Sequence, residues 1–289
     1  MAKVGIIGGS GLYKMVGLTH IKEETVATPF GGPSDAFITG RLEKTEVVFL
    51  PRHGRGHRHS PCTINYRANI FGMKKLGVDA ILSVSAVGSL REKIRPMDFV
   101  VVDQFVDRTW GARPSTFFND GIVAHVAFAD PVAPELREIL IKACKQAGVT
   151  AHKKGTYLCM EGPQFSTRAE SELYRSWGMD VIGMTNLSEA KLAREAEISY
   201  ATLAAVTDYD CWHDAHETVS VEMILGYLNK NTENAKAILK AAIPQVGAVK
   251  QFSAAGALKF AIVTDPAIIP KKTKRDLKPL IGKYIKSNA

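Results

Sequence analysis

Short apolar runs rich in β-branched residues alternate with amphipathic helical segments along most of the chain. The apolar runs have the length and composition of buried strands and lie at 3–7, 36–42, 45–50, 80–86, 99–105, 154–160, 180–184, 198–206 and 256–263. Helical patterns occupy 65–76, 134–147, a segment from 167, 186–196 and 219–242. No Pro-, Gly- or Ser-rich linker separates these segments before residue 250. The alternation therefore predicts one α/β domain over residues 1–289.

Basic residues are concentrated near the C-terminus. The formal net charge is +8, but residues 271–289 hold seven Lys or Arg and one Asp, which leaves +2 for the rest of the chain. A nucleic-acid-binding domain usually spreads basic residues over one face. We therefore expect no nucleic acid as a partner, and we interpret 271–289 as a basic, solvated tail. The alternative is a non-enzymatic nucleotide- or RNA-binding protein that uses this tail.

Several classes of protein are disfavoured by the sequence. The apolar runs are shorter than the ~18–20 residues of a membrane helix. The first residues enter a strand and a glycine turn without the pattern of a signal peptide. The cysteines are isolated from one another, which is typical of reduced thiols, and they are Cys62, Cys144, Cys159 and Cys211. We expect a cytoplasmic protein with no membrane partner.

Two carboxylates follow the most apolar of the predicted strands. Asp208 and Asp210 come directly after the run at 198–206. Ligands of open α/β sheets bind outside the carboxyl ends of the strands. Because burying a charge is costly unless it is paired, these two acids require a partner.

Groups that favour anions occur at other predicted strand ends. The turn after the first strand carries Ser10, and the run at 51–59 contains three arginines and three histidines, among them Arg52 and His53, with no acidic residue inside it. Ser85 lies near the end of the strand at 80–86, and Thr185 lies at a predicted helix start, where free N–H groups favour anions. If the sheet brings these groups together, they form a pocket for an anion of about phosphate size.

A metal site is the competing interpretation. His57 and His59 have ligand-like spacing, but the positive charge around them opposes a cation. A metal-dependent hydrolase could instead use a cluster of four residues further along the chain, namely Asp208, Asp210, His213 and His216. We expect no metal.

Six motifs occur in the order found in the purine nucleoside phosphorylase family. They are Gly-Ile-Ile-Gly-Gly-Ser-Gly at 5–11, Arg-His-Gly at 52–54, Ala-Val-Gly-Ser-Leu-Arg at 86–91, Glu-Gly-Pro-Gln-Phe-Ser at 161–166, Met-Thr at 184–185 and Thr-Asp-Tyr-Asp-Cys-Trp at 207–212. The chain resembles this family over about 3–247, and it most resembles the S-methyl-5′-thioadenosine phosphorylase subfamily.

The resemblance implies a fold, a reaction and an assembly. The fold would be a mixed, distorted central β-sheet flanked by helices. Inorganic phosphate would attack C1′ of 5′-methylthioadenosine and release adenine and 5-methylthioribose 1-phosphate, without a metal or organic cofactor. The partners would be the nucleoside, phosphate and further copies of the chain in a homotrimer or a dimer of trimers.

The resemblance also assigns roles to individual residues. Phosphate would be held by Ser10, Arg52, His53, Ser85, the Ala86 backbone and Thr185. The nucleoside would be contacted by Met184 at the ribose and by Phe165, Ser166, Asp208 and Asp210 at the base. Substrate specificity at the base and the methylthio group would come from Ser166, Val219, Val221 and Ile224. His125 would reach the active site of a neighbouring subunit.

The two acids suit the implied chemistry. Cleavage of the glycosidic bond places negative charge on the purine, and a protonated carboxyl group at N7 can neutralise it. Asp208 is the candidate donor, and Asp210 would support it through the 6-amino group or a water. A carboxylate accepts from a 6-amino group and opposes a 6-oxo group. The alternative function is a sister phosphorylase that acts on 5′-methylthioinosine or on purine nucleosides.

Two positions depart from the family pattern near Thr185. Asn186 and Ser188 replace the more usual Thr and Pro of the motif Met-Thr-x-x-Pro-Glu. We expect loss of this proline to loosen the helix start and to weaken phosphate binding. We expect Asn186 and Glu189 to cap a helix that runs to Ala196.

Overall fold

A computed structural model describes residues 1–9, 12, 15–111, 113–213 and 221–285, with the backbone alone at 221–225. Within these ranges the strands form one eleven-stranded sheet. The strands are β1 (Val4–Gly8), β2 (Leu18–Glu24), β3 (Phe37–Leu42), β4 (Thr45–Pro51), β5 (Ala80–Ser89), β6 (Phe99–Val101), β7 (Gln104–Arg108), β8 (Ala151–His152), β9 (Thr156–Met160), β10 (Val181–Gly183) and β11 (Ser199–Asp208). The main path runs β2-β3-β4-β1-β5-β10-β9-β7, and β11 pairs with β5 and β6.

The sheet combines parallel and antiparallel pairing. β1 is parallel to β4 and β5, and β11 is parallel to β5. β3 is antiparallel to both β2 and β4, and β10 is antiparallel to β5. Strand β5 forks, because its first four residues pair with β1 whereas Gly88 and Ser89 pair with β10. The predicted mixed, distorted α/β sheet is confirmed.

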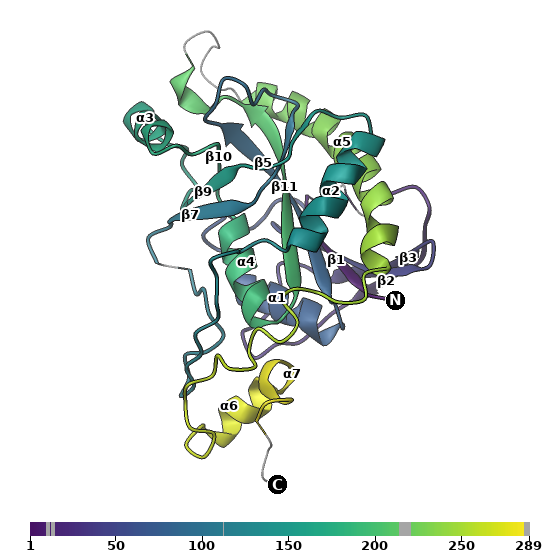
Figure 1. Ribbon diagram of the computed structural model, residues 1–289, viewed down its shortest axis with the longest axis vertical. Coiled ribbons are helices and arrows are strands. Elements are labelled where there is room, and N and C mark those ends of the chain that lie inside the picture. Colours follow the sequence, from purple (N-terminus) through teal and green to yellow (C-terminus); the bar gives the residue numbers. More distant parts are fainter. Residues whose placement is uncertain (10–11, 13–14, 112, 214–220, 286–289) are drawn as a thin grey trace.

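Helices cover both faces of the sheet (Figure 1). The helices are α1 (Tyr66–Lys75), α2 (Pro134–Gln146), α3 (Arg168–Ser176), α4 (Asn186–Glu195), α5 (Val221–Gly247), α6 (Lys271–Asp276) and α7 (Lys278–Ile281). One apolar cluster joins α2 and α5 to the sheet, and a second joins α1 and α4 to it. Successive strand residues point to opposite faces, so Ile6 enters the first cluster and Ile7 the second.

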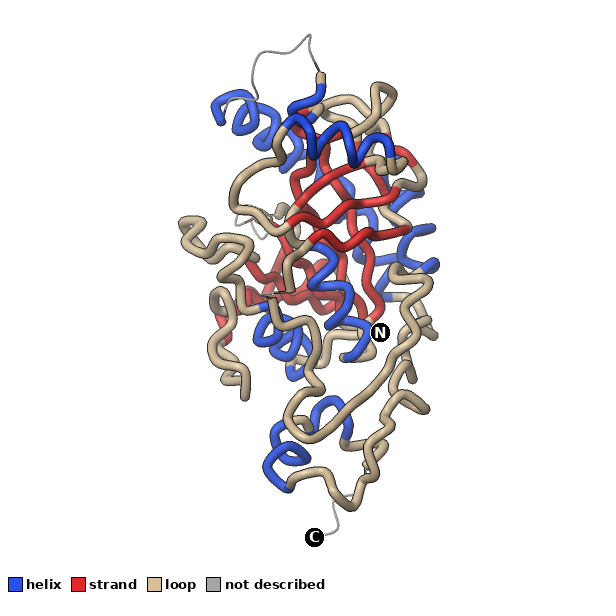
Figure 2. The backbone as a smooth tube through the Cα atoms, turned by 90° about the vertical axis from the view of Figure 1, so that its left-hand side faces the viewer, coloured by secondary structure: helices blue, strands red, loops and turns tan. Residues whose placement is uncertain are grey.

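The C-terminal segment is folded onto the domain. α6 and α7 lie below the sheet beside long loops (Figure 2). Apolar residues of this segment are buried in the cluster that also contains Phe117 and Phe118, and they are Leu277, Leu280, Ile281 and Ile285. Lys283 forms an ion pair with the buried Glu197. The prediction of a solvated tail is therefore wrong for 271–285, because its apolar side chains complete a core.

Several predicted elements differ from the structure. The run at 99–105 forms two strands, β6 and β7, that pair with different neighbours. The run at 256–263 is a loop that makes a single bridge, between Ala124 and Ile262. The pattern at 219–242 belongs to the helix α5, whose described start is Val221 and whose end is Gly247. Strand β2 was not predicted, because most of its side chains are exposed and polar.

Candidate active site

The sheet opens at the fork in β5. Pairing with β1 ends at Ser83 and pairing with β10 begins at Gly88. Ala86 lies between these points and is exposed, although Ser85 and Val87 on either side are buried. Between Ser83 and Gly88 one edge of β5 pairs with neither β1 nor β10, whereas the other edge pairs with β11 throughout. Ser85 and Ala86, two predicted phosphate ligands, lie at this opening.

Arg52 follows β4 and is buried against β5. Its Nε and Nη2 donate to the two carboxylate oxygens of Glu189 on α4, at 2.5 and 3.2 Å. Nη2 also donates to Ser83 Oγ at 2.6 Å, and Nη1 donates to the Val84 carbonyl at 3.0 Å. A guanidinium has five N–H groups, so these contacts leave one N–H on Nη1 for a ligand. In this structure Arg52 is half of a buried ion pair, and its role in phosphate binding stays a prediction.

Glu189 determines which groups donate and which accept in a buried hydrogen-bond network. Its carboxylate also accepts from Ser83 Oγ at 2.7 Å and from the Tyr200 hydroxyl at 2.8 Å. Both hydroxyls donate to Glu189, so each can only accept from the Asn186 amide nitrogen, at a distance of 2.9 Å. The amide oxygen of Asn186 then accepts from Ser85 Oγ at 2.6 Å. The hydroxyl proton of Ser85 is therefore bound to Asn186 in this structure.

Thr185 rather than Asn186 is the N-cap residue of α4. The side chains of Thr185 and Asn186 do not cap this helix, because no side-chain hydrogen bond reaches its first turn and Asn186 points into the core network. The expected caps, Asn186 and Glu189, are thus wrong. Thr185 is buried at the N-terminus of α4, where the sequence predicts that the free N–H groups bind an anion.

His53 is held by its neighbours in the loop after β4. Its Nδ1 lies 2.8 Å from the His59 carbonyl oxygen, and its ring stacks on His57 at 4.1 Å between centroids. A carbonyl only accepts, so the Nδ1 carries the proton and the Nε2 of the neutral ring is an acceptor. Burial, together with the charge of Arg52, lowers the pKa of His53 to about 4.

The remaining arginines of this loop have acidic partners. Arg55 pairs with Glu23 at 2.8 Å and with Asp35 at 2.7 Å. Arg58 approaches Asp35 at 3.7 Å. The sequence interpretation of an anion-seeking basic loop is therefore wrong for Arg55 and Arg58, because β2 and the residues before β3 supply the counter-charges from outside the run.

Asp208 and Asp210 lie together at the end of β11. The register of β11 against β5 shifts between Val206 and Asp208, and Asp210 has a left-handed backbone with φ 53°. Asp208 accepts from the Asp210 N–H at 2.8 Å and from Thr207 Oγ1 at 2.6 Å. Burial raises the pKa of Asp208. Burial and the neighbouring Asp208 raise the pKa of Asp210 to about 6.

The missing side chain of Gly88 lets these acids pack closely against β5. A Cβ at this position would lie 3.0 Å from Asp208 Oδ1 and 3.3 Å from Asp210 Cβ. Gly88 is three residues beyond Ser85 on one strand, so about 10 Å of β5 separates the opening in the sheet from the acids. One strand therefore places the predicted anion site and the predicted base site within the length of a nucleoside.

The segment at 161–166 lies beside the acids. Phe165 is exposed on 63 % of its surface, so its ring is accessible for stacking. Ser166 Oγ donates to Met160 Sδ at 3.3 Å, and its carbonyl accepts from Cys211 Sγ at 3.3 Å. This second contact ties the predicted base segment to the residue after Asp210.

The comparison with known proteins adds to this geometry. The family model described as "Phosphorylase superfamily" matches residues 3–244. The chain belongs to the phosphorylase superfamily.

Relatives within the superfamily share one name. The chain is 56% identical over 282 residues to the S-methyl-5′-thioadenosine phosphorylase of Geobacter sulfurreducens, with 98% of this chain and 99% of the relative covered. It is 59% identical to the S-methyl-5′-thioadenosine phosphorylase of Thermosynechococcus vestitus, with the same coverage.

Solved structures agree with the superfamily assignment. A methylthioadenosine phosphorylase from an antarctic soil metagenomic library superposes with a TM-score of 0.93 at 50% identity, covering 96% of this chain and 98% of that one. A Schistosoma mansoni methylthioadenosine phosphorylase in complex with adenine superposes with a TM-score of 0.82 at 35% identity, covering 97% of this chain and 98% of that one.

Sequence reasoning missed a buried arginine that joins three parts of this phosphorylase site. Arg113 donates to the Glu161 side chain at 2.8 Å and also to the carbonyls of Glu161 and Met184. Its guanidinium lies 5.7 Å from the centre of the Tyr66 ring. A single Arg in a polar loop carries no pattern, so only the fold reveals that it holds the predicted ribose residue Met184 beside the predicted base segment.

Other predicted residues lie outside the described chain or away from the site. Ser10, His216 and Val219 fall outside the described residues, and the side chains of Val221 and Ile224 are not described. His125 is exposed, and its N–H donates to the Ala261 carbonyl at 2.8 Å.

Within the described ranges, no group of three or more His, Cys, Asp or Glu side chains could hold a metal ion. His213, part of the proposed metal cluster, lies 3.3 Å from Glu92 and stacks on Tyr209. The same part of the chain contains no helix long and apolar enough to cross a membrane.

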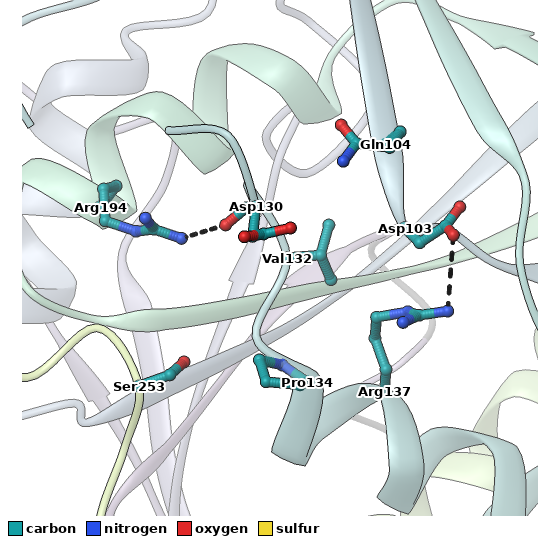
Figure 3. Close-up of a pocket in the computed structure, with 8 residues that line it drawn as sticks. All are labelled: Asp103, Gln104, Asp130, Val132, Pro134, Arg137, Arg194 and Ser253. Atoms are coloured by element: carbon teal, nitrogen blue, oxygen red, sulfur yellow. Dashed lines mark hydrogen bonds and ion pairs between the residues drawn. The ribbon is translucent and has the colours of Figure 1, made fainter. Parts of the chain in front are cut away.

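A separate pocket of about 400 Å³ lies at the start of α2. Its walls carry two acids and two arginines, and Figure 3 shows Arg194 directed at the Asp130 carbonyl and Arg137 directed at Asp103. None of the predicted site residues lines this pocket.

Proposed function

We propose that this chain catalyses the phosphorolysis of S-methyl-5′-thioadenosine, releasing adenine and 5-methylthioribose 1-phosphate. The observation that carries the proposal is the arrangement along β5, where the opening at Ser85 and Ala86 is followed within one strand by Gly88, against which Asp208 and Asp210 pack. Relatives at 49–59% identity over nearly the whole chain bear this enzyme's name.

The groups present suit both halves of the reaction. Phosphate oxygen forms a bond to C1′ while the bond from C1′ to N9 breaks, and its electron pair moves into the purine. A proton from Asp208 to N7 neutralises that charge, and burial, which raises the pKa of Asp208, favours its protonated form. Asp210 accepts from the 6-amino group. The step needs no metal or organic cofactor.

The remaining residues complete the substrate site. Phosphate is bound at the opening by Ser10, Arg52, His53, Ser85, the Ala86 backbone and Thr185. Phe165 and Ser166 contact the base and Met184 the ribose, while Val219, Val221 and Ile224 receive the methylthio group. Arg113 supports this proposal, because it holds Met184 against the segment that carries Phe165.

We propose that the enzyme is a homo-oligomer, most simply a trimer, in which His125 contributes to a neighbouring site. Apolar side chains exposed around His125 support this assembly, and they are Val123, Phe260, Val263 and Ile268. A bridge between Ala124 and Ile262 joins the two segments that carry them. Four free cysteines fit action in the reducing cytoplasm. Sedimentation of the pure protein tests the assembly.

One assay tests the function. Purified enzyme is given methylthioadenosine, methylthioinosine, adenosine or inosine, with and without phosphate, and release of the base is measured. We expect rapid, phosphate-dependent release from methylthioadenosine that survives a chelator. Equal rates on methylthioinosine would favour the sister phosphorylase, and release that needs a metal but not phosphate would favour the hydrolase. The phosphate concentration at half-maximal rate also tests whether Ser188 weakens phosphate binding.

A further inference from the structure

Helix α3 connects the base segment to the acid pair. It begins two residues after Ser166, and a capping box between Thr167 and Glu170 holds its first turn. The next residue, Ser171, is fully buried and faces the residues that follow β11. Ser171 Oγ donates to Asp210 Oδ2 at 2.6 Å. This distance is typical of a hydroxyl bound to an ionised carboxylate.

A backbone donor also reaches the Asp210 carboxylate. The Cys211 N–H favours the ionised form of Asp210 together with Ser171, whereas both oxygens of Asp208 accept from Thr207 and Asp210. Both side chains pack against Gly88 of β5. The Ser171 hydroxyl is therefore bound to Oδ2 and does not occupy Oδ1.

The charges around Asp210 oppose its ionisation, and Ser171 counteracts them. Asp208 on β11 and Glu170 on α3 are acidic neighbours that raise the pKa of Asp210, in addition to burial. Arg168 and Arg175 also project from α3, and Arg175 lies 3.6 Å from the centre of the Trp212 ring. The Cys211 thiol adjoins the acid, and burial together with the charge of Asp210 raises the pKa of this thiol. Ser171 is the side-chain donor that favours the ionised form of Asp210.

We propose that the Ser171 hydroxyl is a positioning group that keeps Asp210 a hydrogen-bond acceptor and thereby sets the preference of the site for a 6-aminopurine over a 6-oxopurine. An ionised Asp210 accepts from the 6-amino N–H. A protonated Asp210 donates to a 6-oxo group. Loss of the Ser171 hydroxyl shifts the acid toward the protonated form at neutral pH. This inference rests on the proposed function and deepens it.

The test compares S171A and S171C, which remove the strong donor, with S171T, which retains it. S176A is the matched control, because Ser176 lies on the same helix and its hydroxyl is bound to the Leu173 carbonyl. The readout is kcat/KM for methylthioadenosine and for methylthioinosine from pH 6 to 9. In S171A the acidic side of the pH profile moves upward by about one pH unit, so activity on methylthioadenosine falls about threefold at pH 6.5 and recovers by pH 8.5.

Selectivity provides a readout that general damage to the fold would not change. The ratio of kcat/KM for methylthioadenosine to that for methylthioinosine should fall about tenfold in S171A and S171C at pH 6.5, and should match wild type in S171T and S176A. An equal loss at every pH, or an unchanged ratio, overturns the proposal.

Binding of free adenine separates this inference from the proposed function. Calorimetry of adenine binding across the same pH range reports on Asp210 whether or not the enzyme cleaves methylthioadenosine. If wild type shows no phosphate-dependent cleavage, the proposed function fails. If the pH dependence of adenine affinity is the same in wild type and S171A, the Ser171 inference fails.

Discussion

At the scale of single residues, the two acids at the end of β11 differ in their surroundings. Both oxygens of Asp208 accept hydrogen bonds from the chain, whereas Asp210 is bound through one oxygen by Ser171. Acids this close to each other do not ionise independently. Substitution at either position therefore changes the protonation of the pair as well as one contact.

Asp208→Asn tests the proton donor. The amide cannot give a proton to N7, so we expect kcat/KM for methylthioadenosine to fall by about 100-fold or more. Steady-state kinetics measure this loss, and Asp265→Asn, on an exposed turn, is the control. Turnover close to wild type in Asp208→Asn would exclude Asp208 as the donor.

Glu189→Gln tests the buried ion pair that organises the opening in the sheet. The carboxylate accepts from Arg52, Ser83 and Tyr200, and the amide leaves the buried guanidinium without a counter-charge. We expect a loss of about 3–5 kcal/mol in the free energy of unfolding. Urea denaturation gives this value, with the exposed Glu172→Gln as control. Equal stability of the two variants would show that the pair does not hold the site.

At the scale of elements, α4 contributes to the site at one end and holds a loop at the other. Its N-terminus lies at Thr185, and Glu195 at its C-terminus accepts from Thr116 Oγ1 and the Phe117 N–H, at 2.7 Å each. Thr116 lies three residues after Arg113, which binds the carbonyl of Met184. The loop at 113–117 is therefore bound to the residue before the N-terminus of α4, through Arg113 and Met184, and to the C-terminus of α4, through Glu195.

Glu195 makes this attachment sensitive to pH. Burial raises its pKa from 4.5 to about 7. Because the folded protein binds this proton more tightly than the unfolded chain, the stabilisation is complete below pH 4.5 and is lost as the pH rises to about 7. The full effect is at most about 3 kcal/mol.

Glu195→Gln removes this titration. The decline in stability between pH 5 and pH 8 should be smaller in the variant than in wild type, because Asp210 still contributes to it. Urea unfolding at several pH values measures the difference, and Glu138→Gln on the exposed side of α2 should behave as wild type. Parallel stability curves for wild type and Glu195→Gln would contradict the assignment.

At the scale of the whole molecule, the chain is closed by its C-terminal segment. Leu280 is buried together with Ile70 of α1 and with Phe118 of the loop between β7 and α2. The basic residues of α6 and α7 lie largely on the outside, as at Lys272, whose side chain is 79 % exposed. The same segment thus supplies surface charge and part of the second core cluster.

Leu280→Ala should lower the free energy of unfolding by about 2–5 kcal/mol, because it leaves a cavity in that cluster. Thermal and urea unfolding measure the loss, and Lys272→Ala is the exposed control. If Leu280→Ala were as stable as Lys272→Ala, α7 would contribute nothing to the core.

Local sequence determined the elements and many of the predicted site residues. The apolar run that ends at Asp208, the helix start after Thr185 and the capping box at Thr167 and Glu170 are short-range patterns, and the structure confirms each of these elements. Such patterns depend on backbone hydrogen bonding and side-chain periodicity within a few residues, which a sequence displays directly.

Contacts between distant parts of the chain could be decided only by the tertiary structure. Glu189 reaches Arg52 across 137 positions, and Ser171 reaches Asp210 across 39. The counter-charges of Arg55 and the burial of Leu280 likewise come from segments remote in sequence. Whether a charge is paired or an apolar side chain is buried depends on these distant neighbours. For this reason the sequence determined which groups are present at the site, while the fold decided which of them are already occupied.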